Sequence, residues 1–404
     1  MKIKFECNTL TIYLSGRIDA GSAAGIENEI TEALKQYPDS TLVFDAEGLK
    51  RISSAGLRVL LKFSKQSANK PEIINASKDV YDIFDVTGFT ELFNVRKKLR
   101  EISLDGLEVI GVGISATVYR LNPETIVKVF NNNQTLRHFP LSKIENDRRI
   151  SREVFLHDIP TAIPFDVVKA GEFYGIVYEM IEADSMSGVL RKHPERLNEL
   201  SLKAAKLLKK LHATEFDEGT FRDARWYPHD MTRAIYEKGF ISSEDRTEID
   251  ELIDRIPYRN TFVHCDFHPN NLLVRDDELI IIDVGEAGQG NPIIDLLISF
   301  GHFVYLPRLS ADEGHHIHEK IIGLNADMLK ASWDIMLPEY LGIDDKAAVK
   351  KYEEVISKYA SIIIMAVLQM NPRKLPHDEL QKTINRVMIP FRDSIKTLKP
   401  IEGI

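Results

Sequence analysis

The fold of this chain is decided by the stretch His264–Asn271, which reads HCDFHPNN, and by Ile281–Gly285, which reads IIDVG. Together they place an Asp, an Asn five positions later and, after an apolar segment, a second Asp. Asp and Asn are also common turn residues, so this spacing alone is not specific. Two histidines in the first stretch offer the alternative of a metal-binding pair, although neither an HExxH motif nor a set of cysteines accompanies them.

The three polar residues Asp266, Asn271 and Asp283 are the groups that phosphoryl transfer requires. One carboxylate orients or deprotonates the acceptor hydroxyl, while an amide and a second carboxylate hold Mg²⁺ against the nucleotide phosphates. We therefore predict that Asp266 is the catalytic base and that Asn271 and Asp283 bind the metal. His264 is expected to be a buried histidine that braces the loop.

A glycine-containing turn lies upstream, within Leu107–Leu121. Glycine lets backbone N–H groups approach phosphate oxygens without a Cβ clash, which predicts a nucleotide-covering hairpin. The predicted phosphate-binding residues of this turn are Gly111, Gly113 and Ser115. A dinucleotide-binding turn is the alternative, but it would need a helix next, and the β-favouring Thr117–Tyr119 follows instead.

Lys128 lies in the otherwise apolar segment Thr125–Phe130. A charge in such a strand is costly unless it is paired, so we predict that Lys128 binds the nucleotide phosphates and pairs with a helix acid. The alternative is an edge-strand lysine that points to solvent. A helix predicted over residues 141–157 supplies the acids, of which Glu145 is the first choice and Asp147 the second.

The second part of the chain resembles the aminoglycoside phosphotransferase and choline kinase branch of the protein-kinase-like fold. The resemblance rests on the segments His264–Leu273, Ile282–Asp283 and Gly290–Leu296. It implies a bilobal α+β domain with an N-lobe over 105–182, a C-lobe over 183–404 and a helical acceptor-binding region. It also implies a hinge in which Glu179 and Ile181 bind the nucleotide base, and an Asp295 that supports the loop.

Two departures from protein kinases favour a small-molecule kinase. Cys265 stands where protein kinases have Arg, and only nine residues separate Gly285 from Asp295, which leaves no room for an activation segment. The resemblance therefore implies ATP and Mg²⁺ as cofactors and a small-molecule hydroxyl as acceptor.

The first part, residues 1–104, reads as strand, strand, helix, strand, helix, strand, helix. Alternating apolar residues predict strands around 10–14, 41–45 and 72–75, and helical periodicity predicts helices over 20–37, from Ser53, and over 77–87. Serine favours the start of a helix because its hydroxyl can satisfy a free backbone N–H.

This first part resembles the α/β STAS domain of anti-sigma factor antagonists. The resemblance rests on Gly16–Asp19, Ile52–Leu57 and Val86–Phe93. It implies a regulatory module that binds a protein partner, and it makes Ser54 the matching position for reversible phosphorylation. A phosphate there would meet free N–H groups at the helix start. The alternative is that Ser54 only caps the helix.

Composition narrows the class of protein. With 44% hydrophobic and 28% charged residues the chain is an ordinary globular protein, and the two cysteines Cys7 and Cys265 form no disulfide framework, which fits the cytoplasm. No apolar run of about 18 residues occurs, so we expect no membrane span. The net charge of −9 lies almost entirely after residue 104, which argues against a nucleic-acid partner.

The sequence thus predicts an ATP- and Mg²⁺-dependent phosphotransferase joined to a STAS domain. The alternative is a signalling protein in which the STAS domain binds partners while the kinase-like domain senses nucleotide or phosphorylates Ser54. The C-terminal part contains the run His315–His318, for which metal binding and a solvated helix face are both open.

Overall fold

The computed structural model describes residues 2–6, 8–38, 40–66, 70–113, 115–131, 139–312, 319, 322–370 and 375–399. Cys7 and His315–His318 lie outside these residues. The chain forms two compact units, one of residues 1–103 and 168–172 and one of residues 104–167 and 173–404. The domain boundaries given above stay predictions.

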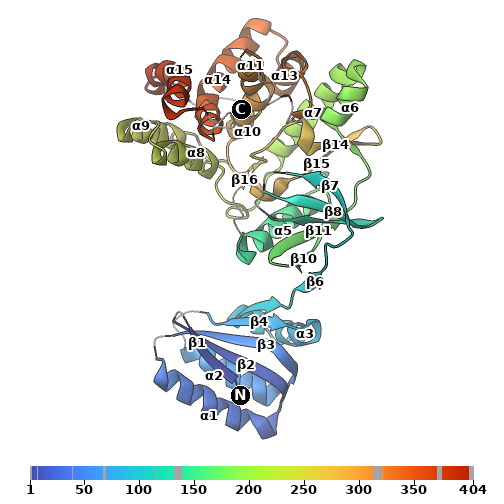
Figure 1. Cartoon of the computed structure of the whole chain (residues 1–404), viewed down its shortest axis with the longest axis vertical. Helices are drawn as coiled ribbons and strands as arrows, with labels where there is room; N and C mark the ends of the chain where they lie inside the picture. Colours follow the sequence, from blue (N-terminus) through green and yellow to red (C-terminus); the bar gives the residue numbers. More distant parts are fainter. Residues whose placement is uncertain are drawn as a thin grey trace. The chain divides into compact units, whose positions relative to one another are not determined.

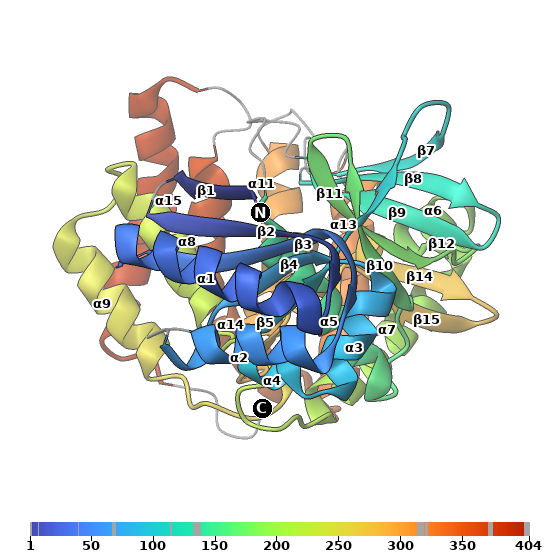
Figure 2. The same cartoon turned by 90° about the horizontal axis from the view of Figure 1, so that it is seen from below.

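The first unit contains a five-stranded sheet in the order β1-β2-β3-β4-β5. Its strands and helices are β1 (Lys2–Glu6), β2 (Thr9–Ile18), α1 (Ala20–Gln36), β3 (Thr41–Ile52), α2 (Ser54–Gln66), β4 (Glu72–Ala76), α3 (Lys78–Val86), α4 (Phe89–Leu92), β5 (Asn94–Lys97) and β6 (Arg100–Ile102). β1 is antiparallel to β2, while β2 to β5 run parallel. Figures 1 and 2 show α1 and α2 side by side on one face of this sheet. The predicted α/β order is confirmed.

Local sequence explains how the first helices begin. Asp19 precedes α1, and its carboxylate accepts hydrogen bonds from the backbone N–H groups of Gly21 and Ser22. At the start of α2, Ser53 Oγ accepts from the N–H of Gly56 at 3.5 Å. These side chains satisfy N–H groups that the first turn of a helix leaves without partners.

The second unit begins with an antiparallel sheet and one long helix. Its elements are β7 (Glu108–Val112), β8 (Thr117–Asn122), β9 (Thr125–Val129), α5 (Leu141–Leu156), the first part of β10 (Pro164–Ala170) and β11 (Phe173–Glu179). β7, β8, β9 and β11 pair antiparallel in the order β7-β8-β9-β11. The glycine turn joins β7 to β8, and β8 pairs with β9, the strand that carries Lys128.

The rest of the second unit is mainly helical. Its elements are β12 (Asp184–Ser185), α6 (Met186–Lys192), η1 (Pro194–Arg196), α7 (Leu197–Ala213), α8 (Trp226–Glu237), α9 (Ser243–Asp254), β13 (Phe262–Val263), η2 (Pro269–Asn271), β14 (Leu272–Arg275), β15 (Glu278–Ile281), η3 (Val284–Glu286), β16 (Gly288–Gln289), α10 (Ile293–Phe300), η4 (Gly301–Tyr305), α11 (Leu306–Asp312), α13 (Ala326–Leu341), α14 (Lys346–Gln369) and α15 (His377–Ile395). α13 packs along α7, and α14 packs along both α10 and α15 (Figure 1).

This arrangement is the bilobal α+β fold with a helical C-terminal region that the resemblance implied. One large apolar cluster runs from α5 to the end of α15. In the described part of the chain no helix is both long and apolar enough to cross a membrane.

Candidate active site

The loop that carries Asp266 is held in a strained shape by one buried carboxylate. Cys265 has a φ of +64°, which side chains other than glycine rarely adopt. Asp295 on α10 accepts hydrogen bonds from the N–H of His264 and the N–H of Cys265, each at 2.7 Å. Asp295 is fully buried, so its carboxylate depends on these donors. The structure thus places Asp295 where its predicted supporting role requires.

Two further residues extend this buried network. His212 Nε2 lies 3.0 Å from Asp295 Oδ2, and His212 Nδ1 lies 2.8 Å from the hydroxyl of Tyr340. The sequence alone gives no sign of this chain of contacts, because α7, α10 and α13 are far apart in it. In the sequence, His212 lies at the end of an apolar helical stripe, and this position predicts only a structural role.

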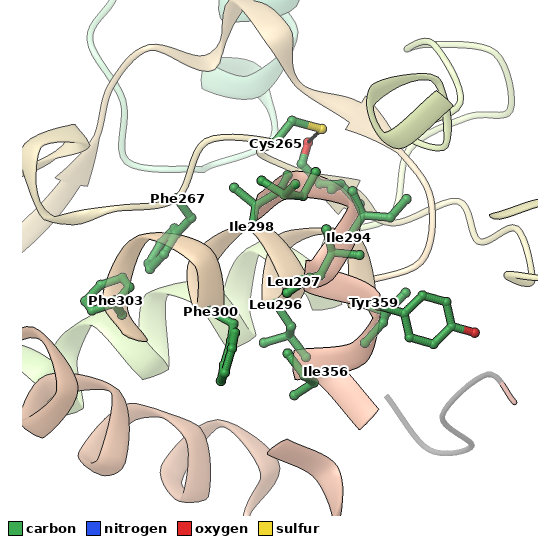
Figure 3. Close-up of a cluster of buried hydrophobic side chains, with 14 of the residues drawn as sticks. Cys265, Phe267, Ile294, Leu296, Leu297, Ile298, Phe300, Phe303, Ile356 and Tyr359 are labelled. Carbon is green, nitrogen blue, oxygen red and sulfur yellow. Dashed lines mark hydrogen bonds between the residues drawn. The ribbon is translucent and has the colours of Figure 1, made fainter. Parts of the chain in front are cut away.

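The apolar side of the same loop is anchored in the core. Figure 3 shows Cys265 and Phe267 beside a cluster that includes Ile294, Leu297 and Phe303. Burial raises the pKa of the Cys265 thiol well above its usual range, so this cysteine remains a neutral packing group. The loop is therefore fixed from both sides, by hydrogen bonds and by apolar packing.

His264 connects the two halves of the site. Its Nδ1 accepts a hydrogen bond from the N–H of Asp266 at 3.1 Å, so its Nε2 carries the proton and donates to the carbonyl of Ile282 at 3.1 Å. His264 is completely buried. Both ring nitrogens are thus hydrogen-bonded to backbone groups, which excludes the alternative of a metal pair with His268.

Asp266 lies among hydrogen-bond donors and is 37% exposed. The Asn271 amide donates to Asp266 Oδ2 at 3.0 Å and to its carbonyl at 2.9 Å. His268 Nε2 and His302 Nε2 lie 3.4 and 3.8 Å from Asp266 Oδ1. Burial alone would raise the pKa of Asp266, but His268 foremost and then His302, which both face its carboxylate, outweigh burial and hold that pKa well below its usual range. Asp266 is therefore a carboxylate at neutral pH.

Lys128 and Asp283 form an ion pair between the two lobes of this unit. Burial alone would lower the pKa of Lys128, but Asp283, Tyr178 and Asp147 raise it, so Lys128 stays charged. Lys128 thus does not point freely to solvent. The choice of Glu145 as its partner is wrong: the ion pair is with Asp283. The acid of α5 that acts on Lys128 is the buried Asp147, two residues after Glu145 and the second choice from the sequence.

A cavity of about 1290 Å³ brings the predicted nucleotide site together. It is lined by nearly all of the predicted residues, namely Gly111, Gly113, Ser115, Lys128, Glu179, Ile181, Asp266, Asn271 and Asp283. Glu145 is not among its lining residues. The turn above the cavity is closed by a 2.8 Å hydrogen bond from the N–H of Gly113 to the carbonyl of Ala116.

The hinge offers a backbone donor to a ligand. The N–H groups of Glu179 and Met180 donate to the carbonyls of Ile163 and Glu124, at 2.9 and 2.8 Å. Over the described residues, the N–H of Ile181 donates to no other group. Ile181 lines the cavity, so its N–H is placed to donate to the edge of a nucleotide base bound there.

The donor set fits Mg²⁺, which prefers carboxylate and amide oxygens. Asn271 uses its amide NH₂ in the bonds to Asp266, so its Oδ1 is the atom that can bind a cation. Asp283 offers a carboxylate that is 45% exposed. Within the described ranges no cluster of three or more His, Cys, Asp and Glu side chains is arranged for a metal. A two-residue site suits Mg²⁺, which takes its other ligands from substrate phosphates and water.

Ser54 lies in the first unit, at the first position of α2. It is exposed, and the helix is capped by Ser53 instead. The alternative that Ser54 itself caps the helix is therefore wrong, while its phosphorylation stays a prediction.

Comparison with known proteins identifies both parts of the chain. The model of the phosphotransferase enzyme family matches residues 106–318, just over half of the chain, and the STAS domain model matches residues 1–102. No curated protein matches the chain. An ADP-bound aminoglycoside phosphotransferase, APH(2'')-Ib, is similar at 16% identity over 78% of this chain and 98% of that chain, with a TM-score of 0.45.

A choline/ethanolamine kinase family protein from Mesorhizobium loti is similar at 15% identity over 72% of this chain and 88% of that chain, with a TM-score of 0.43. The family matches confirm the two resemblances stated from sequence motifs. The chain belongs to the phosphotransferase enzyme family and carries a STAS domain ahead of its phosphotransferase domain.

Proposed function

We propose that this protein transfers the terminal phosphoryl group of ATP, in the presence of Mg²⁺, to a hydroxyl of a small molecule. The observation that carries the proposal is the single cavity that contains the glycine turn, Lys128 and the three polar residues Asp266, Asn271 and Asp283. Asn271 and Asp283 would hold Mg²⁺, which neutralises charge on the phosphates.

In the proposed reaction the acceptor oxygen forms a bond to the terminal phosphorus, and the bond from that phosphorus to the bridging oxygen of ADP breaks. The hydroxyl proton moves to Asp266 Oδ1 and then to solvent. Asp266 is a weak base because its pKa lies below the usual range, so its main contribution is to orient the hydroxyl. Lys128 would balance charge on the nucleotide phosphates.

Asp266→Asn tests the proposal. With Mg-ATP and a panel of aminoglycosides, amino alcohols, choline-like amines and sugars, ADP release should fall by roughly 10²-fold or more. Nucleotide affinity should change little, because Asn keeps the shape of the side chain. Asp344→Asn, at an exposed position in the same unit, is the control. Unchanged turnover in Asp266→Asn would refute the assignment.

The second candidate is regulatory, and the exposure of Ser54 at the start of α2 favours it. In this case the kinase-like domain phosphorylates Ser54, and the phosphate alters how the STAS domain binds a protein partner. Intact mass after incubation with Mg-ATP alone decides: a gain of one phosphate that Ser54→Ala abolishes supports it. No gain, with ADP released only when an acceptor is added, supports the small-molecule enzyme.

A further inference from the structure

Lys143, in the first turn of α5, joins two acids from different parts of the chain. Its Nζ lies 2.8 Å from Glu286 Oε1 and 3.0 Å from Asp147 Oδ2. Glu286 belongs to the short turn η3, which begins directly after Asp283. One ammonium group therefore connects α5 to the segment that carries the proposed metal ligand.

The same segment lies directly against Asp147. A Cβ atom added to Gly285 would come within 3.0 Å of Asp147 Cγ, closer than nearly all natural Cβ contacts. Asp147 itself is only 5% exposed. A buried carboxylate is costly without a cation beside it, and Lys143 is the cation that forms an ion pair with it.

Lys128 is the other cation that acts on Asp147. The two lysines thus form ion pairs with three carboxylates: Lys128 pairs with Asp283, and Lys143 pairs with Asp147 and Glu286. Burial raises the pKa of Asp147 to about 6 even with Lys143 beside it. Without Lys143, Asp147 would lose the cation that is paired with it, and η3 would lose its ionic contact with α5.

We propose that Lys143 is a positioning residue of the Mg²⁺–nucleotide site, because it fixes the turn after Asp283, the proposed metal ligand, against α5. This inference rests on the proposed function and names a residue that no motif of the sequence singles out. Lys143 touches neither the cavity nor the reacting groups, so its effect should appear in the metal-dependent part of nucleotide binding.

The test is calorimetric titration of the full chain with ADP, once with Mg²⁺ and once with EDTA. Lys143→Met should weaken ADP binding in Mg²⁺ by roughly tenfold, as the loss of residues that orient metal ligands does, and leave binding in EDTA unchanged. Lys143→Arg should restore affinity in Mg²⁺ to within about threefold of wild type, because it keeps the charge.

Two further variants guard against a folding defect. Glu286→Gln removes one arm of the contact but leaves Asp147 paired, so it should show a smaller loss that is again confined to Mg²⁺. Lys192→Met, which removes an exposed ion pair with Asp184, is the matched control and should bind as wild type does.

Two results would overturn the inference: equal affinities of wild type and Lys143→Met in Mg²⁺, or an equal loss with Mg²⁺ and with EDTA in both Lys143→Met and Glu286→Gln. If wild type binds ADP no better with Mg²⁺ than with EDTA, the proposed function fails, and the inference that rests on it fails too.

Discussion

At the scale of the residue, Asp266 shows how this site favours orientation over strong base catalysis. Asn271 donates to one of its carboxylate oxygens, and His268 Nε2 faces the other at 3.4 Å. Each donor stabilises the charged form and lowers the basicity of the carboxylate. In a loose phosphoryl-transfer transition state, little proton transfer from the hydroxyl is needed before the bonds to phosphorus break and form. A well-placed weak base is therefore sufficient.

Asp295→Asn should destabilise the second unit. Its carboxylate accepts from two backbone N–H groups, and an Asn would have to present its NH₂ to one of them, which leaves a buried donor without a partner. We expect a loss of about 2–3 kcal/mol in the free energy of unfolding. Urea unfolding followed by tryptophan fluorescence measures it, because Trp226 and Trp333 both lie in this unit. A change as small as that of Asp344→Asn would contradict the account of the loop.

Asp147→Asn should change how the stability of the second unit depends on pH. Burial, against the opposing effect of Lys143, raises the pKa of Asp147 from 3.8 to about 6, so between these values the folded chain binds a proton that the unfolded chain does not. The free energy of unfolding of wild type relative to Asp147→Asn should therefore rise as the pH falls from about 6 to about 4, by at most about 3 kcal/mol. Urea titrations at a series of pH values test this, and a constant difference would exclude the pKa shift.

At the scale of the element, an ion pair joins the last helix to α9. Arg392 on α15 donates to both oxygens of Asp245 on α9, at 2.7 and 2.8 Å. Burial alone would raise the pKa of Asp245, but Arg392 and Ser242 outweigh burial and lower it. The contribution of this pair is therefore present above about pH 4, the usual pKa of an aspartate, and is lost as the pH falls further.

Arg392→Met should lower the free energy of unfolding by about 1–2 kcal/mol at pH 7, because it leaves the charged Asp245 without its strongest partner. The difference from wild type should shrink in acid, when Asp245 is protonated. Tryptophan-detected urea unfolding at pH 7 and in acid gives both values. Arg386→Met, at an exposed position on the same helix, should have little effect at either pH.

Elements with clear periodicity could be predicted from sequence, and those made by tertiary pairing could not. α5, expected over 141–157, spans Leu141–Leu156, because its apolar residues follow helical spacing. β5 has the sequence NVRK, with one apolar residue, and is a strand only because it pairs in parallel with β4.

In the candidate site too, local motifs could be predicted from the sequence, whereas tertiary contacts could not. The motif residues Asp266, Asn271 and Asp283 are close in sequence and line one cavity. The ion pair of Lys128 with Asp283 could not be predicted, because the two residues are far apart in the sequence. Which acid of α5 lies near Lys128 is decided by packing, which buries Asp147. His302 faces Asp266 from η4, a contact that no local pattern encodes.

At the scale of the whole molecule, two large apolar cores in the described part of the chain share no residue. One comprises side chains of β2 to α4, and the other those of α5 to α15. Because hydrophobic burial is the main favourable contribution to stability, separate cores favour separate unfolding transitions. Far-UV circular dichroism reports on both units, whereas tryptophan fluorescence reports only on the second.

Gly56→Ala should therefore lower the stability of the first unit and leave the unfolding transition of the second unit unchanged. A Cβ atom at this position would lie 2.6 Å from Ile18 Cγ2 and 2.7 Å from Ile52 Cγ1, so α2 could no longer approach the sheet as closely. We expect a loss of about 1–3 kcal/mol in the first unit, seen by circular dichroism but not by fluorescence. Gly25→Ala is the matched control, since nothing lies within 4 Å of its Cβ position and alanine favours a helix. Mg-ATP should increase the stability of the second unit alone, because a ligand stabilises the unit that binds it. It should therefore shift the unfolding transition seen by tryptophan fluorescence and leave that of the first unit unchanged. If Gly56→Ala lowers both transitions equally, the two cores unfold as one cooperative unit and the division into separate folding units is wrong.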